Sequence, residues 1–236
     1  MSIRDIRRKY GQNYLKDPAV LFEMGEAISP NTFDTFIEIG PGLGALTNQI
    51  NKENVNIIGI DIDKGNIEAL KSKFKGPANF QFINEDILKF KLEDSGTSLR
   101  IIGNLPYNIS TQIILNYVDS YKKIIDMHFL VQKEVAQKIA GKVSTKDWGK
   151  LAIKISAFFE IEILFDVPRE AFDIIPKVNS TFIRLLPKKD LSYNLSIKNN
   201  LKRLDIDWNK ININPSKRSE EISLKDYINI AKDYSA

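Results

Sequence analysis

The sequence predicts an α/β protein with a mostly parallel, doubly wound sheet, followed by a small helical domain. Short β-branched runs alternate with amphipathic helical patterns over residues 18–187, which is typical of such a sheet. A glycine-rich turn follows the first of these runs, as in nucleotide-binding folds. From residue 188 onward the chain is polar and rich in Asn, Lys and Asp. We therefore predict two domains, residues 1–187 and 188–236.

The composition is that of a globular protein without disulfides. The chain has 236 residues, 43% of them hydrophobic, which is enough to bury one main core. It contains no cysteine, which excludes disulfides and thiolate zinc sites, and we expect no metal. No apolar run reaches 18 residues, so we expect a cytoplasmic protein that crosses no membrane, and a monomer by default. His128 lies in an apolar run and is expected to be a hydrogen-bonded core residue rather than a ligand.

Positive charge is concentrated at the two ends of the chain. Residues 1–16 carry five basic and one acidic side chains, and residues 188–236 carry ten and seven, whereas the middle is slightly acidic. Basic ends that flank a catalytic body suit a polyanion such as RNA, although a solvated surface has the same composition.

The N-terminal elements predict a loop followed by a helix. Residues 10–15, Tyr-Gly-Gln-Asn-Tyr-Leu, combine a glycine with paired amides, which is typical of a loop laid over a site. The apolar spacing over residues 18–28 predicts an amphipathic helix that begins after Asp17, with Pro18 in its first position.

The next elements predict a nucleotide site. A strand over residues 35–39 runs into Gly40 and Gly42, which permit a tight turn and close backbone approach. The second strand ends at Asp61, 21 positions after Gly40, which suits a carboxylate that accepts both ribose hydroxyls. This pattern fits both NAD and S-adenosylmethionine, because each contains an adenosine.

A second acidic residue follows the third strand. Residues 80–83 end at Asn-Glu-Asp, which places Asp86 where it can recognise an adenine amino group. Asp63 and Glu85 flank these positions, and each is better explained as a helix N-cap or an exposed charge. Because ligands bind at strand carboxyl ends, we expect Gly40, Asp61, Asp86 and Asn104 to share one rim of the sheet.

The fourth strand ends in the stretch on which the chemistry depends, Ile101-Ile102-Gly103-Asn104-Leu105-Pro106-Tyr107. The Asn104 oxygen and the Leu105 carbonyl are able to accept hydrogens from a purine amine, while the Tyr107 ring stacks on the base. Pro106 holds the turn rigid. A structural Asn in a proline turn beside a packed Tyr is the alternative interpretation.

The remaining elements complete the sheet. We predict a helix near 113–118, a strand over 127–131, helices over 133–140 and 149–159, and a closing strand pair, 161–167 and 180–186. The loop between that pair carries Phe172, which either stacks on the opposite face of an extruded base or packs under its own loop. Leu224 to Ala231 is an amphipathic segment of the predicted C-terminal helical domain.

Several of these motifs together resemble the KsgA-type ribosomal RNA small-subunit adenine N6-dimethyltransferases. The similarity runs from Arg8 to about Pro187 and includes residues 9–15, the glycine turn at 38–44, Gly103-Asn104-Leu105-Pro106-Tyr107-Asn108-Ile109-Ser110, Gln132-Lys133-Glu134-Val135, and Phe172 through Ser180. The resemblance implies a Rossmann-like domain that transfers methyl groups from S-adenosylmethionine. The implied target is N6 of two adjacent adenines in the 3′-terminal hairpin loop of 16S rRNA, in the 30S particle or its precursor.

The resemblance also implies roles for individual residues. The cofactor contacts would be Asn13, Leu15, Gly40, Asp61, Asp86 and Asn104. The groups around the target base would be Asn104, Leu105, Pro106, Tyr107 and Phe172.

The chain departs from the family pattern at two places. It has Asp61 where the family usually has Glu, and it lacks a basic Arg-Arg-Lys stretch after Leu195, with residues 197–201 resuming the pattern. Two rival functions share the main motifs: a resistance methyltransferase acting on large-subunit rRNA, and a non-catalytic ribosome assembly factor. Gln132-Lys133-Glu134-Val135 and Pro176-Lys177-Val178 favour the small-subunit enzyme.

Overall fold

The computed structural model describes residues 13–76, 79–188 and 221–233 of the 236-residue chain. The chain divides into two compact units, Met1–Ala136 with Ile161–Pro187, and Gln137–Glu160 with Lys188–Ala236. The sequence pattern places residues 137–160 in the first domain, whereas in the structure they group with the C-terminal residues. The basic arm before residue 13 and the segment after Leu195 lie outside the described residues.

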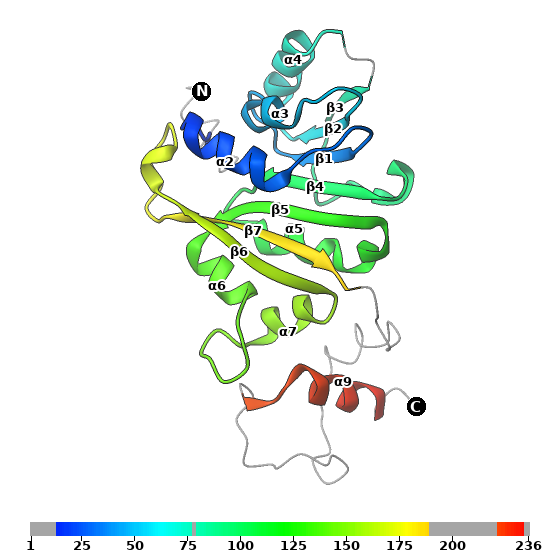
Figure 1. Cartoon of the computed structure of the whole chain (residues 1–236), viewed down its shortest axis with the longest axis vertical. Helices are drawn as coiled ribbons and strands as arrows, with labels where there is room; N and C mark the ends of the chain where they lie inside the picture. Colours follow the sequence, from blue (N-terminus) through cyan, green and yellow to red (C-terminus); the bar gives the residue numbers. More distant parts are fainter. Residues whose placement is uncertain (1–12, 77–78, 189–220, 234–236) are drawn as a thin grey trace. The chain divides into compact units, whose positions relative to one another are not determined.

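The sheet has seven strands in the order β3-β2-β1-β4-β5-β7-β6 (Figure 1). The strands are β1 (Thr35–Ile39), β2 (Asn56–Asp61), β3 (Phe80–Asn84), β4 (Leu99–Asn104), β5 (Ile124–Gln132), β6 (Phe159–Val167) and β7 (Ser180–Pro187). Strands β1 to β5 are parallel and β7 is antiparallel to β5, so the predicted mostly parallel sheet is confirmed. The strand order reverses between β1 and β4, and ligands bind at the carboxyl ends beside such a reversal.

Helices precede, connect and follow these strands. They are α2 (Pro18–Ile28), α3 (Ala45–Ile50), α4 (Lys64–Lys73), α5 (Ser110–Asn116), α6 (Lys133–Ile139), α7 (Lys150–Ser156) and α9 (Leu224–Asp233), with short 3₁₀ turns at Leu92–Ser95, Val118–Lys123 and Arg169–Ala171. The Asp17 carboxylate caps α2 by accepting from the backbone N–H groups of Ala19 and Val20 at 2.9 and 3.3 Å. The helix predicted over 149–159 ends at Ser156, because Phe159 already belongs to β6.

The core lies between α2, α3 and the sheet. Met24, Ile28 and Ile50 are buried in one cluster with Phe36 of β1 and Ile57 of β2. Gly103 lets β4 approach β1, since a Cβ there would lie 2.7 Å from the Ile39 carbonyl oxygen.

A buried ion network closes the sheet at its amino end. Arg100 on β4 donates to the Asp126 carboxylate from Nε at 2.9 Å and from Nη2 at 2.7 Å, and to Asp34 from Nη1 at 2.7 Å. It also donates to the backbone carbonyl of Ser29 at the end of α2. This end of the sheet is therefore occupied by protein, which leaves the carboxyl ends for a ligand.

His128 is a core residue, as predicted. The hydrogen bonds predicted for its ring are not found among the described residues. Neither ring nitrogen has a partner in the described part of the chain. The ring lies beside Phe182, and Asp126 Oδ1, which already accepts from Arg100, is 3.7 Å from Nδ1. Burial lowers the pKa of His128 to about 4, so the ring is neutral at physiological pH.

The smaller unit has a compact cluster of its own. Trp148 packs with Ala152, Ile153 and Tyr227, and its Nε1 donates to the Ile222 carbonyl at 2.9 Å. The amphipathic segment predicted from Leu224 lies in α9. Across the described ranges, no helix combines the length and apolar character needed to cross a membrane.

Candidate active site

A cavity of about 290 Å³ lies at the carboxyl ends of β1 to β4. Eight of the predicted site residues line it: Asn13, Gly40, Asp61, Asp86, Asn104, Leu105, Pro106 and Tyr107. Its size approaches that of pockets that hold drug-sized ligands. The single rim expected from the sequence is therefore confirmed.

The glycine turn presents bare backbone to this cavity. Gly40 and Gly42 have φ of +61° and +57°, a region that favours glycine. A Cβ on Gly40 would meet no atom within 4 Å, so a ligand has room to approach the backbone there. A Cβ on Gly42 would lie 2.9 Å from the Tyr14 ring, which covers that side of the turn.

Asp61 is the best-anchored polar group of the cavity. Its Oδ1 accepts from the Asp63 N–H at 2.8 Å, and its Oδ2 accepts from the Gly42 N–H at 3.2 Å and from Asn66 Nδ2 at 3.0 Å. Burial nevertheless raises the pKa of Asp61 above its usual value. A carboxylate has about four acceptor sites, so three protein donors leave room for a ligand hydroxyl.

Asp86 and its neighbours form the far wall. Asp86 Oδ1 accepts from the Leu88 N–H at 3.0 Å, which holds the carboxylate in a turn after β3. Asn84 donates to the carbonyls of Asp61 and Ile62, both at 3.0 Å, and so joins the ends of β2 and β3. Asp63 is the N-cap of α4, as predicted, because its carboxylate accepts from the Gly65 N–H.

The orientation of the Asn104 amide is determined by one contact. Its Nδ2 donates to the Asn13 backbone carbonyl at 2.8 Å, and only the NH₂ end of an amide is able to donate to a carbonyl. The Oδ1 atom has no donor among the described residues. Asn104 therefore offers an uncommitted acceptor to a ligand in the cavity that it lines.

The turn after Asn104 is held from both sides. The Leu105 N–H donates to the Leu130 carbonyl at 3.0 Å, and the Tyr107 hydroxyl is 2.7 Å from the Ser180 hydroxyl on β7. Burial raises the pKa of Tyr107, so its phenol stays neutral and able to hydrogen-bond. The Tyr107 ring is thereby fixed at the cavity wall.

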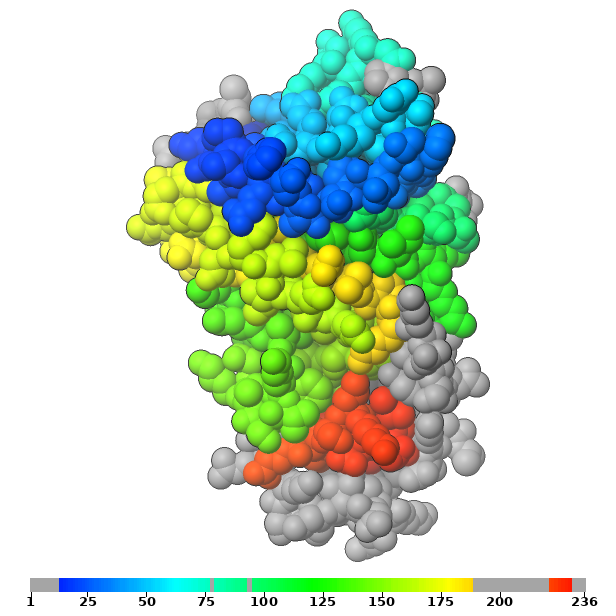
Figure 2. Space-filling view, viewed as in Figure 1, coloured from blue at the N-terminus to red at the C-terminus, as the bar shows by residue number. Residues whose placement is uncertain are grey.

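Residues 13–17 pair with the loop between β6 and β7. Leu15 forms an antiparallel bridge with Phe172, and the N–H groups of Lys16 and Asp17 donate to the Ala171 carbonyl at 2.9 and 3.2 Å. Figure 2 shows the N-terminal segment, in blue, lying against this loop, in yellow. The pairing places the Asn13 carbonyl beside Asn104.

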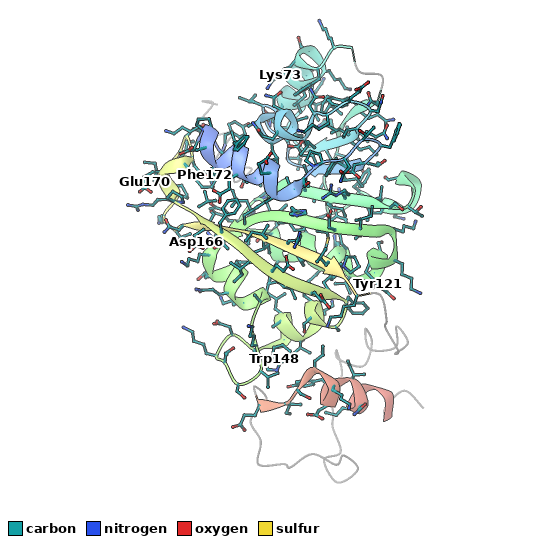
Figure 3. All side chains as sticks on the ribbon, viewed as in Figure 1. Lys73, Tyr121, Trp148, Asp166, Glu170 and Phe172 are labelled. Atoms are coloured by element: carbon teal, nitrogen blue, oxygen red, sulfur yellow. The ribbon has the colours of Figure 1, made fainter. Side chains whose placement is uncertain are left out.

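Phe172 and Leu15 do not line this cavity. Phe172 is fully buried in the core cluster that contains Leu15 and Val167, and Figure 3 labels it beside α2, with Glu170 at the outer tip of the loop. Phe172 thus packs under its own loop in this structure, which is the second of its two predicted placements, and its contact with a target base stays a prediction. Leu15 lines a second cavity of about 390 Å³, which shares Tyr14, Gly40 and Asn104 with the first.

Glu38 is a buried acid that the sequence analysis did not single out. It lines the second cavity and accepts from the Thr47 hydroxyl at 2.6 Å. Burial raises its pKa to about 7. The sequence did contain a signal for a buried acid, because Glu38 lies inside the otherwise apolar strand Thr35–Ile39.

The apolar walls of the first cavity, which include Ile62 and Ile87, were not predicted from the sequence. The position of Ile62 directly after Asp61 was a usable signal. Among the residues that the structure describes, no group of three or more His, Asp or Glu side chains is placed to hold a metal ion.

Comparison with known families identifies one that matches most of the chain. The family described as "Ribosomal RNA adenine dimethylase" matches residues 3–203. A curated relative from Wigglesworthia glossinidia brevipalpis, "Ribosomal RNA small subunit methyltransferase A", is 37% identical over 251 residues and covers 96% of each chain. A protein of the same name from Marinobacter nauticus is 40% identical over 189 residues, which are 79% of this chain and 68% of that one.

Solved structures show the same fold. A dimethyladenosine transferase from Plasmodium falciparum superposes with a TM-score of 0.67 at 27% identity, over 74% of this chain and 63% of that one. The 23S rRNA methyltransferase ErmE reaches a TM-score of 0.76 at 19% identity, over 95% of this chain and all of that one. At that identity the second similarity concerns the fold alone.

Proposed function

This chain belongs to the ribosomal RNA adenine dimethylase family, and on that premise we propose that it dimethylates N6 of two adjacent adenines in the 3′-terminal hairpin loop of 16S rRNA. Membership in the family makes the chain an S-adenosylmethionine-dependent rRNA adenine methyltransferase. The observation that carries the proposal is the Asn104 amide, which donates to Asn13 while its oxygen accepts from none of the described residues, in the same cavity wall as Tyr107.

The cavity fits the adenosine of the methyl donor. We assign Asp61 to the ribose, because its carboxylate accepts from the Gly42 N–H of the glycine turn and keeps an acceptor site. Asp86 is assigned to the adenine amino group, with Ile62 and Ile87 as apolar walls for the ring. Asn13, Leu15 and Gly40 are assigned to the remainder of the cofactor, near the second cavity.

Orientation of the target amine is the main task of Asn104 and Leu105. The N6 lone pair of adenine is delocalised into the ring, so the amine is a poor nucleophile. Hydrogen bonds from its two hydrogens to Asn104 Oδ1 and to the Leu105 carbonyl favour the geometry in which the lone pair is localised. The Tyr107 ring, fixed through Ser180, stacks on the base, and Pro106 keeps the turn rigid.

Bound S-adenosylmethionine supplies an electrophilic methyl group on a sulfonium. In each transfer N6 forms a bond to the methyl carbon, the carbon–sulfur bond breaks and its electron pair stays on sulfur, and N6 then loses a proton to water. Monomethylated adenine keeps one N6 hydrogen, so a single acceptor is enough to orient it. The same site is therefore able to perform the second transfer.

The substrate particle and the state of the enzyme are part of the proposal. The names of the relatives favour the small ribosomal subunit or its precursor as the partner. We propose that the chain acts on it as a monomer in the cytoplasm, where subunits mature.

The test is methyl transfer from labelled S-adenosylmethionine to unmethylated 30S subunits and, in parallel, to 50S subunits. We expect label in 30S only, located at N6 of two adjacent adenines. Label in 50S would assign the chain to the large-subunit class. Cofactor binding without label in either particle would make it a non-catalytic assembly factor.

A further inference from the structure

A chain of hydrogen bonds leads from Asp61 through Asn66 to Tyr14, which lines both cavities. Asn66, buried in the first turns of α4, donates from Nδ2 to Asp61 Oδ2 at 3.0 Å. The other end of the same amide, Oδ1, accepts from the Tyr14 hydroxyl at 3.0 Å. The Tyr14 donor therefore defines which end of the Asn66 amide faces the carboxylate.

Tyr14 is itself held by backbone contacts. Its N–H donates to Asp173 Oδ1 at 3.2 Å, and its carbonyl accepts from the Asp173 N–H at 2.9 Å. Its ring covers Gly42, where a Cβ would lie 2.9 Å from it. Gly42 in turn donates to the same Asp61 oxygen as Asn66. Tyr14 thus acts on Asp61 by two routes, through Asn66 and through the glycine turn.

We propose that Asn66 and Tyr14 are positioning residues that hold the Asp61 carboxylate in the orientation that recognises the ribose hydroxyls of the cofactor. This inference rests on the proposed function, in which Asp61 binds ribose. Asn66 does not line the cavity, so its effect on a ligand passes through Asp61. Together with the Gly42 N–H, Asn66 occupies Oδ2, whereas Oδ1 accepts from a single donor within the described ranges and keeps the open acceptor site.

The experiment compares two ligands by calorimetry: S-adenosylhomocysteine and its counterpart with a 2′,3′-dideoxyribose. The ratio of their dissociation constants measures hydroxyl recognition alone. We expect Asn66→Leu to weaken binding of S-adenosylhomocysteine about tenfold, the size of one hydrogen bond to a charged group, and to leave the dideoxy ligand within twofold. Tyr14→Phe should also weaken binding of S-adenosylhomocysteine, but by a smaller factor. The Asn66 amide then loses the Tyr14 hydroxyl that orients it and keeps its own hydrogen bond to Asp61.

A double-mutant cycle separates positioning from general packing. In an Asn66→Leu background Tyr14→Phe should have no further effect on the ratio, and in an Asp61→Ala background neither change should alter it. Asn48→Leu on α3 is the matched control, since Asn48 is exposed and lies outside both cavities. It should leave both dissociation constants unchanged.

Two results would overturn the positioning role. One is an unchanged ratio in Asn66→Leu, and the other is equal weakening of both ligands, which would indicate damage to the site as a whole. Failure of the proposed function gives a different signature, because then Asp61→Ala alone would leave the ratio unchanged. Thermal unfolding of each variant shows that the comparison is made on folded protein.

Discussion

At the scale of single residues, the site depends on how one amide and two acids are held. Asn104 is oriented by the Asn13 carbonyl, and Asp61 by three donors. Glu38 is buried and shares its strand with no cationic partner, so its neutral form is favoured until about pH 7. These three residues therefore support predictions on catalysis and on stability that are independent of one another.

The first prediction concerns Asn104. We expect Asn104→Ala to lower the rate of methyl transfer by at least about 10²-fold, the cost of one lost electrostatic contact to a reacting group. Binding of rRNA should stay near the wild-type level, because the amide contacts the reacting amine and not phosphates. Single-turnover transfer and filter binding measure the two quantities.

Asn116→Ala is the control for that variant, since Asn116 is exposed at the end of α5 and lies outside the cavity. Near-normal turnover in Asn104→Ala would remove the proposed role of the amide oxygen.

The second prediction concerns pH and stability. The pKa of Glu38 is raised from 4.5 to about 7 in the folded protein, so the folded state holds this proton more tightly than the unfolded state does. Its contribution to stability is therefore complete below pH 4.5 and is lost as pH rises toward 7. Glu38→Gln cannot lose that proton, while its carbonyl still accepts from Thr47.

We expect Glu38→Gln to gain stability over the wild type on going from pH 5 to pH 8, by roughly 2 to 3 kcal/mol. Urea unfolding at the two pH values measures the gain. Titration of His128 cancels in the difference between the two proteins. Parallel pH profiles for both proteins would mean that Glu38 has an ordinary pKa.

At the scale of secondary-structure elements, the N-terminal segment and the β6–β7 loop act together. Asp173 on the loop binds the backbone of Tyr14, and Ala171 accepts from the next residues of the segment. The segment in turn supplies the Asn13 carbonyl to Asn104. A substitution in the β6–β7 loop is therefore expected to affect both cofactor binding and the orientation of the Asn104 amide.

The third prediction tests this connection. Asp173→Ala should raise the KM for S-adenosylmethionine several-fold and lower kcat, because residues 13–15 lose the acceptor for the Tyr14 N–H. Asp173→Asn keeps an Oδ1 acceptor and should recover most of both constants. Steady-state kinetics with 30S subunits provides the comparison, and identical defects in the two variants would assign the effect to the negative charge instead.

At the scale of the whole molecule, the basic chain ends are expected to bind RNA, and the site on the sheet is expected to carry out the chemistry. The sheet gathers the site at one edge, while the basic residues concentrate at the chain ends. Phosphate contacts supply affinity for RNA that depends on salt, whereas the site acts on one base. Affinity for rRNA and chemistry should therefore be separable by mutation.

The fourth prediction concerns the N-terminal arm. Replacing Arg7, Arg8 and Lys9 by Gln should weaken rRNA binding and reduce the slope of log K against log salt by up to about two to three, at roughly 0.7 to 0.9 for each of three phosphate contacts. Fluorescence anisotropy over a salt series measures this slope.

The triple change of Lys64, Lys71 and Lys75 to Gln removes the same charge from exposed positions in and just after α4 and is the matched control. An equal change of slope in both variants would assign the effect to net charge rather than to the arm.

The amino-acid sequence by itself determined the features that depend on neighbouring residues. Strand and helix periodicity, the Asp17 cap, the glycine turn and the Asn104–Tyr107 turn are all local, and Asp61 and Asp86 reach the common rim because parallel strands end at the same edge.

Only the tertiary structure decided how distant residues pair. Tyr14 and Asp173, 159 positions apart, hold the segment that orients Asn104, and the Tyr14 hydroxyl donates to Asn66 across 52 positions. The same long-range packing buries Phe172 and leaves His128 without a hydrogen-bond partner in the described ranges. Periodicity identifies the face on which a residue lies, whereas its partners are determined by which elements meet in the folded chain, and no local pattern contains that information.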